Sequence, residues 1–245
     1  MLKLTLRTKL LFLLFSLFFI TLGIGAKGAE LEKTPYSNVK SAFYQEIVYV
    51  NNPDSLAVLV NKNYRLPDHY EPADLVLLDV PLYNESPSNE GNYLRVEAAN
   101  ALKALFDEAS IAGYDLVARS GYRSYETQVM LYNNYAARDG IENADTYSAR
   151  PGHSEHQTGL TIDITSSSVD HGLSETFGET AEGKWVADHA HEFGFIIRYP
   201  QNRTLETGYQ YEPWHLRYVG VEAATQIYNQ DWILEDFILE NGLLD

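Results

Sequence analysis

The sequence predicts an α+β domain in which helices flank a small antiparallel sheet. Segments with the apolar spacing of helices alternate irregularly with short segments typical of strands. No glycine-rich phosphate loop follows any predicted strand, and there is no internal repeat. A chain of 245 residues can bury one substantial core and still carry a terminal segment outside it.

Helices are predicted where apolar residues recur at helical spacing. The clearest is 92–113, which ends at a glycine, and a second covers 124–140, where Ser124 can act as the N-cap. A third is expected over 180–194, and the tail from 221 to 244 reads as largely helical.

Strands are predicted at 114–120, at 195–200 and, as a short piece, within the apolar run 75–78. Segment 159–165 alternates between apolar and polar residues, which is typical of a half-buried strand. Its two faces are Leu160, Ile162 and Ile164 on one side, and Thr161, Asp163 and Thr165 on the other.

The N-terminus has the pattern of an export signal, with basic residues before the apolar run 10–26. A run of this length is also near the lower limit for a membrane-spanning helix of roughly 17–25 residues, so an uncleaved anchor is the alternative. We therefore expect a signal peptide or anchor at 1–28, a spacer or stalk at 29–60 and the functional domain at 61–245.

Charge and cysteine content exclude several classes of function. The formal net charge of −16 argues against a nucleic-acid partner, because phosphate contacts need clusters of Lys and Arg. The chain has no cysteine, so disulfides, thiolate metal sites and a cysteine nucleophile are all excluded. A metal would have to be bound by nitrogen and oxygen ligands.

Four residues together have the composition of a catalytic zinc site with a base. His156 precedes a turn at Gly159, and Asp163 points to the polar face of the strand that follows. His215 would be the third ligand, and three protein ligands leave one position open. Glu212 would stay off the metal and accept a proton from the attacking water.

Taken singly, each of these residues would more often be structural, and only their combination favours a metal site. Pro213 suits a helix start, so we expect Glu212 and His215 to begin a helix and face one site. The remaining histidines rank lower as ligands, with His153 placed at the rim of the site. Arg123 either pairs with a substrate carboxylate or holds its own loop through backbone carbonyls.

Three motifs then carry a family resemblance. In this order along the chain, "SGYRSYETQ", "SEHQTGLTIDI" and "YEPWHLRYVG" resemble the VanY and LdcB group of M15 zinc carboxypeptidases. The pattern S-x-H-x-x-G-x-x-x-D is met from Ser154 to Asp163, and E-x-x-H is met by Glu212 and His215. The resemblance covers roughly residues 61–239 and implies the LAS-type, hedgehog-like peptidase fold, with the metal site at the sheet.

The resemblance implies an exported zinc-dependent D,D-carboxypeptidase that removes the terminal D-alanine from peptidoglycan stem peptides. One Zn²⁺ per chain would be bound by His156, Asp163 and His215, with Glu212 as the base. Arg123 would stabilise the scissile carbonyl or bind the terminal carboxylate. Residues expected to line the substrate site are Arg123, Gln128 and Ser154.

Two other functions stay open. One is an L,D-carboxypeptidase acting on tetrapeptide stems, and the other is a wall-binding module that has lost catalysis. The intact Glu212 argues against the second, because a binding module has no use for a base beside an open metal site. Either way the protein would act on the extracellular side of the cytoplasmic membrane or in the cell wall. It would touch the membrane only through its N-terminal segment, if that segment is uncleaved.

Overall fold

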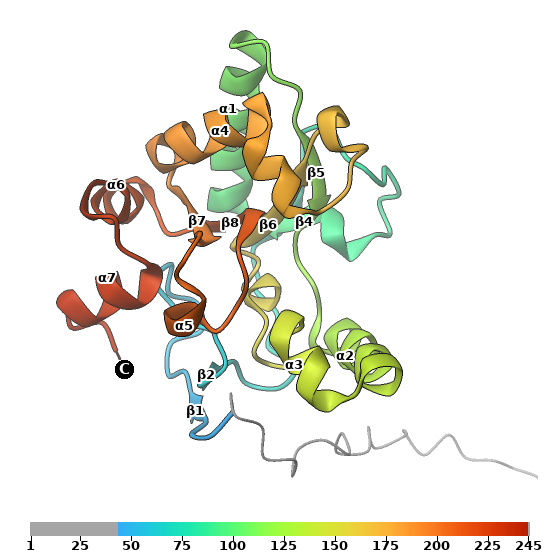
Figure 1. Ribbon diagram of the computed structural model, residues 1–245, viewed down its shortest axis with the longest axis vertical. Coiled ribbons are helices and arrows are strands. Elements are labelled where there is room, and N and C mark those ends of the chain that lie inside the picture. The colour runs from blue at the N-terminus through green and yellow to red at the C-terminus, as the bar shows by residue number, and fades with distance from the viewer. Residues whose placement is uncertain (1–43, 245) are drawn as a thin grey trace, which may run out of the picture. The chain divides into compact units, whose positions relative to one another are not determined.

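The computed structural model of the protein describes residues 44–244. In this part of the chain, helices surround a small sheet (Figure 1). The α-helices are α1 (Val96–Ile111), α2 (Tyr125–Asp139), α3 (Ile141–Tyr147), α4 (Ala181–His189), α5 (Thr204–Thr207), α6 (Val221–Gln230) and α7 (Leu234–Glu240). The 3-10 helices are η1 (Glu90–Asn92), η2 (Glu155–Thr158), η3 (Ser167–Val169), η4 (Glu175–Glu179) and η5 (Ala190–Phe193). The strands are β1 (Val48–Tyr49), β2 (Tyr64–Arg65), β3 (Leu75–Leu77), β4 (Tyr93–Arg95), β5 (Val117–Ser120), β6 (Thr161–Thr165), β7 (Phe195–Tyr199) and β8 (Glu212–Tyr218).

The central sheet has four strands in the order β5-β6-β8-β7, and every neighbouring pair in it is antiparallel. The register of β6 on β8 places Ile162 opposite Leu216 and Asp163 opposite His215. Helices α1 and α4 lie on one side of this sheet, and α2 and α3 lie on the other (Figure 1). The predicted α+β class with a small antiparallel sheet is confirmed.

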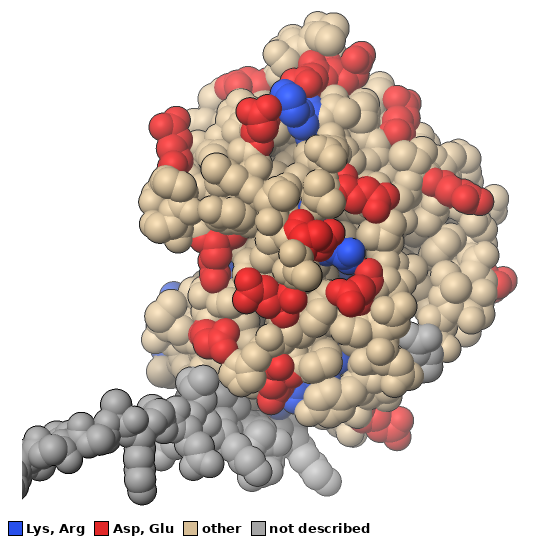
Figure 2. Space-filling view, turned by 180° about the vertical axis from the view of Figure 1, so that it is seen from behind, with Lys and Arg blue, Asp and Glu red and all other residues tan. Residues whose placement is uncertain are grey.

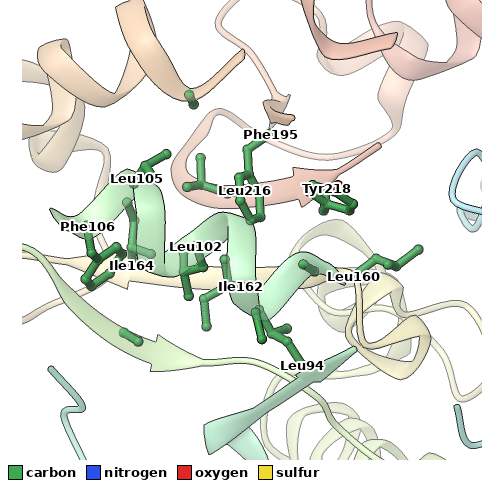
Figure 3. Close-up of a cluster of buried hydrophobic side chains, with 14 of the residues drawn as sticks. Leu94, Leu102, Leu105, Phe106, Leu160, Ile162, Ile164, Phe195, Leu216 and Tyr218 are labelled. Atoms are coloured by element: carbon green, nitrogen blue, oxygen red, sulfur yellow. The ribbon is translucent and has the colours of Figure 1, made fainter. Parts of the chain in front are cut away.

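The main core lies between α1 and the sheet. Leu102 and Leu105 of α1 and Ile162 and Ile164 of β6 are fully buried and belong to one cluster (Figure 3). Burial of this apolar surface is the dominant favourable contribution to folding. It also fixes β6, so that the opposite, polar face of the strand is held toward α2 and α3.

Most predicted elements are present with shifted ends. Ser124 caps α2 as predicted, since its side chain accepts a hydrogen bond from the Thr127 N–H. The helix predicted from residue 92 begins only at Val96, because residues 93–95 pair with β3 as strand β4. The helical tail is divided between α6 and α7 at Asp231, which has a left-handed backbone with φ of 53°.

Two expectations about local structure are wrong. Glu212 and Pro213 do not begin a helix, because the segment pairs with both β6 and β7 as β8. Strand β6 is not half-buried, since all five of its residues are buried. On its polar face, Asp163 is covered by His156 and His215, and the Thr165 hydroxyl donates to the Gly172 carbonyl at 2.8 Å.

The folded unit begins before residue 61. Tyr44, Val58, Leu59 and Val60 are buried, and Val58 and Val60 belong to the main core. The structure therefore places residues 44–60, which the sequence assigned to the spacer, with the folded domain. The predicted signal or anchor at 1–28 and the spacer residues 29–43 lie outside the described residues. Between residues 44 and 244, no helix is both long and apolar enough to cross a bilayer.

Acidic side chains predominate over basic ones on the face shown in Figure 2. The basic residues visible there are few and lie beside acidic ones, so this face presents no continuous basic stripe. The excess of acidic side chains on this face agrees with the formal net charge of −16.

Candidate metal centre

A polar pocket of about 180 Å³ lies between the sheet and helices α2 and α3. It contains every site residue predicted from the sequence, including the metal ligands, the base and the substrate-site residues. The residues that line it are Arg123, Gln128, Leu131, Tyr135, Tyr147, Ser148, Ala149, His153, Ser154, Glu155, His156, Asp163, Tyr199, Tyr209, Glu212, Trp214 and His215.

His156 and Asp163 converge because of a turn between η2 and β6. Gly159 ends η2 in the left-handed conformation with φ of 65°, and a Cβ there would lie 2.9 Å from a Leu75 methyl. The His156 Nδ1–H donates to the Gly121 carbonyl at 2.8 Å. The free Nε2 therefore faces Asp163, at 3.4 Å from its Oδ2.

His215 and Glu212 share the site because β8 is irregular. In a regular strand, residues three apart point to opposite faces. The pairing of β8 with β7 shifts register between Ile197 and Tyr199, as a bulge does. As a result, Glu212 Oε2 lies 3.4 Å from His215 Nδ1, and the same nitrogen lies 3.3 Å from Asp163 Oδ1.

His156, Asp163 and His215 form the metal-ligand group found among the described residues. All three are buried, and each offers a ligand atom within 4.8 Å of the other two. Asp163 Oδ1 is buried without a hydrogen-bond partner, which is costly unless a cation satisfies it. Two imidazoles and one carboxylate are the donor set of catalytic zinc sites that keep an open position. These residues therefore fit a zinc ion.

The pKa shifts in this group follow from burial and from mutual contacts. Burial lowers the pKa of His156 to about 3, so its imidazole is neutral. Burial also opposes charge on His215, but the nearby carboxylates of Asp163, Glu155 and Glu212 outweigh it and raise the pKa of this imidazole well above its usual range. Because a metal binds only the unprotonated nitrogen, metal binding at His215 releases a proton.

Arg123 lies at the pocket wall with its guanidinium fixed on two sides. It donates from Nη1 to Gln128 Oε1 at 3.0 Å and from Nη2 to Ser120 Oγ at 3.2 Å. Gln128 is itself held, because its Nε2 donates to the Ala149 carbonyl at 2.7 Å. The guanidinium is therefore oriented by the side chains of Gln128 and Ser120, whereas one alternative from the sequence had it held by backbone carbonyls. Gln128 lines the same pocket as Arg123. Ser154 is buried beside the ligand segment.

His153 is a buried neutral histidine and lies outside the metal-ligand group. Its Nδ1 is 2.7 Å from the Asn61 carbonyl, to which it donates, and its ring packs edge-on against Tyr44. Burial lowers its pKa to about 4. His153 thus joins residues 44–61 to the segment that carries His156.

This burial predicts a pH dependence of stability. In the unfolded chain His153 becomes protonated below pH ~6.5, whereas in the folded chain it stays neutral until the pH falls to about 4. Stability is therefore lost as the pH falls through this window, by up to about 3 kcal/mol from this residue. His153→Gln keeps an amide donor for Asn61 but cannot titrate. Urea unfolding at pH 7.0 and pH 4.5 should show a smaller loss in the variant, and equal losses would contradict the assignment.

Several residues of the pocket were not predicted from the sequence. Glu155 is completely buried beside His215, although a glutamate between two polar residues reads as exposed. Trp214 lies within the motif "YEPWHLRYVG". Its position between Glu212 and His215 could have indicated that it lines the pocket. Tyr199 stacks at a tilt 4.8 Å from the His215 ring, and nothing in its sequence context indicated that.

Comparison with known proteins agrees with this geometry. Residues 91–221 match the VanY family, described as D-alanyl-D-alanine carboxypeptidase. The chain is 48% identical over 208 residues to YodJ of Bacillus subtilis (strain 168), covering 85% of this chain and 75% of YodJ.

Solved structures are similar as well. The LD-carboxypeptidase LdcB has a TM-score of 0.76 at 49% identity, covering 78% of this chain and 89% of LdcB. VanY, a vancomycin resistance D,D-pentapeptidase solved in complex with Zn(II), has a TM-score of 0.60 at 34% identity, covering 74% of this chain and 98% of VanY. The family match, these identities and the two-histidine, one-carboxylate group together show that the chain belongs to the VanY (M15) family of zinc carboxypeptidases.

Proposed function

We propose that the protein removes the C-terminal D-alanine from peptidoglycan stem peptides, using one zinc ion per chain. The observation that carries this is the convergence of His156, Asp163 and His215 in a pocket beside Glu212. The side chain of Glu212 is 18% exposed, so it faces the pocket opening while the ligands are buried.

Two peptide bonds are candidates for cleavage. The sequence motifs favour a D,D-carboxypeptidase, which would act on pentapeptide stems, and the likeness to the D,D-pentapeptidase VanY at 34% identity supports that. The higher identity of 49% to LdcB, an LD-carboxypeptidase, supports cleavage of tetrapeptide stems. We place the L,D activity first for this reason and keep the D,D activity as the second candidate.

The residues of the pocket divide the chemistry between them. A zinc ion held by the three ligands would polarise the scissile carbonyl and activate a water molecule. Glu212 is placed to accept the proton of the attacking water and pass it to the leaving amine. Arg123 presents fixed donors to charge that develops on the substrate. Tyr199 packs against the His215 ring, and Trp214 lines the same pocket.

The experiment that tests this function separates the candidates. The purified protein is reconstituted with zinc and incubated with tetrapeptide and pentapeptide stems, and released D-alanine is followed by mass spectrometry. Release from the tetrapeptide alone is expected. Release from the pentapeptide alone would reverse the order of the two candidates, and release from neither by the zinc-loaded protein would favour a wall-binding module.

Arg123→Lys is expected to lower kcat/KM about 100-fold, with the loss in kcat. Lysine keeps the charge but cannot make both hydrogen bonds that fix the guanidinium. We expect the loss in kcat because Arg123 lines the same pocket as the ligand His156, so its donors can serve charge that develops on the scissile carbonyl. Steady-state kinetics check this. Arg119→Lys, in a residue that stacks on Tyr83 instead, is the control. A loss confined to KM would assign Arg123 to the terminal carboxylate.

The location follows from the substrate. Stem peptides are exposed outside the cytoplasmic membrane, so we propose that the enzyme acts there after export, directed by residues 1–28. Protease added to intact protoplasts should digest a C-terminally tagged protein or find it already released. Full protection of the tag until lysis would contradict this location.

A further inference from the structure

Glu155 is a buried acid that directly precedes the ligand His156. Its side chain has no exposed surface, and the same is true of its two partners, Arg198 and Arg217. Burying a carboxylate is costly unless ion pairs and hydrogen bonds compensate. A glutamate buried at this position, directly beside a metal ligand, therefore points to a specific role for its carboxylate.

Only one oxygen of Glu155 is used by the arginines. Arg198 Nε donates to Oε1 at 2.8 Å, and Arg217 Nη1 donates to the same oxygen at 2.7 Å. Among the described residues, Oε2 has no hydrogen-bond partner, and neither has His215 Nε2. These two atoms face each other at 3.5 Å. If these two atoms moved slightly closer, the imidazole N–H would donate a hydrogen bond to the carboxylate, and both groups would have a partner.

The arginines hold the carboxylate in place. Arg198 is anchored by a bidentate pair with Glu235, at 2.8 and 2.7 Å. Arg217 is anchored by the carbonyls of Leu56 and Val58, at 2.9 and 2.8 Å. With both guanidiniums fixed, Oε1 is fixed too, and Oε2 is left pointing at the imidazole.

His215 uses its two ring nitrogens on opposite sides. Nδ1 faces Asp163 Oδ1 at 3.3 Å, inside the metal-ligand group, and Nε2 faces Glu155. A ring nitrogen that binds a metal must carry a lone pair, so the proton of the neutral imidazole must sit on the other nitrogen. The carboxylates of Asp163 and Glu212 lie 3.3 and 3.4 Å from Nδ1, so a proton could sit on that side as well. Once a cation takes Nδ1, the Glu155 carboxylate opposite Nε2 stabilises the remaining proton there.

We propose that Glu155 is a positioning residue that holds His215 with its proton on Nε2, so that Nδ1 is directed at the metal. Glu155 itself does not touch the metal, because it lies behind the imidazole ring. This inference rests on the zinc site of the proposed function. It gives the Arg198–Glu155–Arg217 cluster a role in metal affinity as well as in the fold.

The test compares two variants that disturb the same cluster. Glu155→Gln removes the carboxylate behind His215, whereas Glu235→Gln disturbs Arg198 from the far side and leaves His215 untouched. Zinc affinity is measured by chelator competition without peptide, and the Co(II)-substituted protein is examined by visible absorption. We expect Glu155→Gln to weaken zinc binding about 10–100-fold and to alter the cobalt spectrum. Glu235→Gln should leave both unchanged.

Equal zinc affinity in Glu155→Gln and the wild type would overturn the inference, and so would an equal weakening in Glu235→Gln. If Glu155→Gln does not fold, Glu155→Asp decides. Aspartate keeps the charge for both arginines but is one methylene too short to reach His215 as well, so weaker zinc binding in a folded protein is expected and wild-type affinity would contradict the role. Because zinc binding is read without substrate, absence of peptidase activity would count against the proposed function alone.

Discussion

Glu212→Gln is expected to bind zinc normally and to lose D-alanine release by at least about three orders of magnitude. Glutamine has the shape of glutamate but cannot accept the proton of the attacking water. Glu212 Oε2 lies 3.4 Å from His215 Nδ1, beside the ligand group, where a water bound for reaction would be within reach. The ligands His156 and Asp163 keep their own contacts in the variant, so the metal site should remain intact.

Two measurements are needed for this result. Zinc content by elemental analysis should be one per chain in both proteins, and kcat is read from the D-alanine released over time. Glu222→Gln, in an exposed residue of α6, is the matched control and should be unchanged in both. If Glu212→Gln turned over near the wild-type rate, Glu212 would not be the base of the reaction. Loss of zinc would instead make Glu212 a ligand.

Much of the fold could be predicted from local patterns in the sequence. Helix α2 was predictable because Ser124 provides a cap and the apolar spacing is regular. The alternation in β6 correctly separated Ile162 and Ile164, which face the core, from Asp163, which faces the site. Burial of the polar face as well was not predictable, because it depends on segments distant in sequence.

The failures share one physical cause, which is pairing between distant segments. Pro213 has the local signal of a helix start, but the hydrogen bonds of β8 to its two neighbouring strands override it. Residues 44–60 were assigned to the spacer, yet Val58 and Val60 complete the core by packing against segments distant in sequence. Glu155 is buried only because Arg198 and Arg217 reach it from β7 and β8.

The metal group was predictable because chemistry restricts it more than packing does. In a chain without cysteine, zinc needs imidazole and carboxylate ligands, and the motifs placed three of them near turns and strand ends. The structure brings His156, Asp163 and His215 within 4.8 Å. Which nitrogen of each imidazole faces the site could not be predicted, since it depends on the Gly121 carbonyl and on Glu155.

Removal of zinc is expected to destabilise the wild type strongly and to leave Asp163→Asn almost unaffected. A ligand that binds only the folded state adds RT ln(1 + [L]/Kd), about 4 kcal/mol when free zinc is 1,000 times Kd. For a domain of this size that corresponds to a fall of about 10 °C in Tm on chelation. Asparagine keeps the size of Asp163 but lacks the charge that binds the cation, so the variant should gain no such stabilisation.

Thermal unfolding of both proteins, with zinc and with chelator, gives four Tm values that decide the matter. The chelated proteins report the direct effect of the substitution on the fold, which includes the loss of the contacts from Asp163 to His156 and His215. The zinc-dependent difference reports the metal site alone. A wild-type Tm that does not respond to chelation would show that no zinc stabilises the folded protein, which would contradict the metal site. An Asp163→Asn variant that responds as strongly as the wild type would show that zinc is bound by other residues.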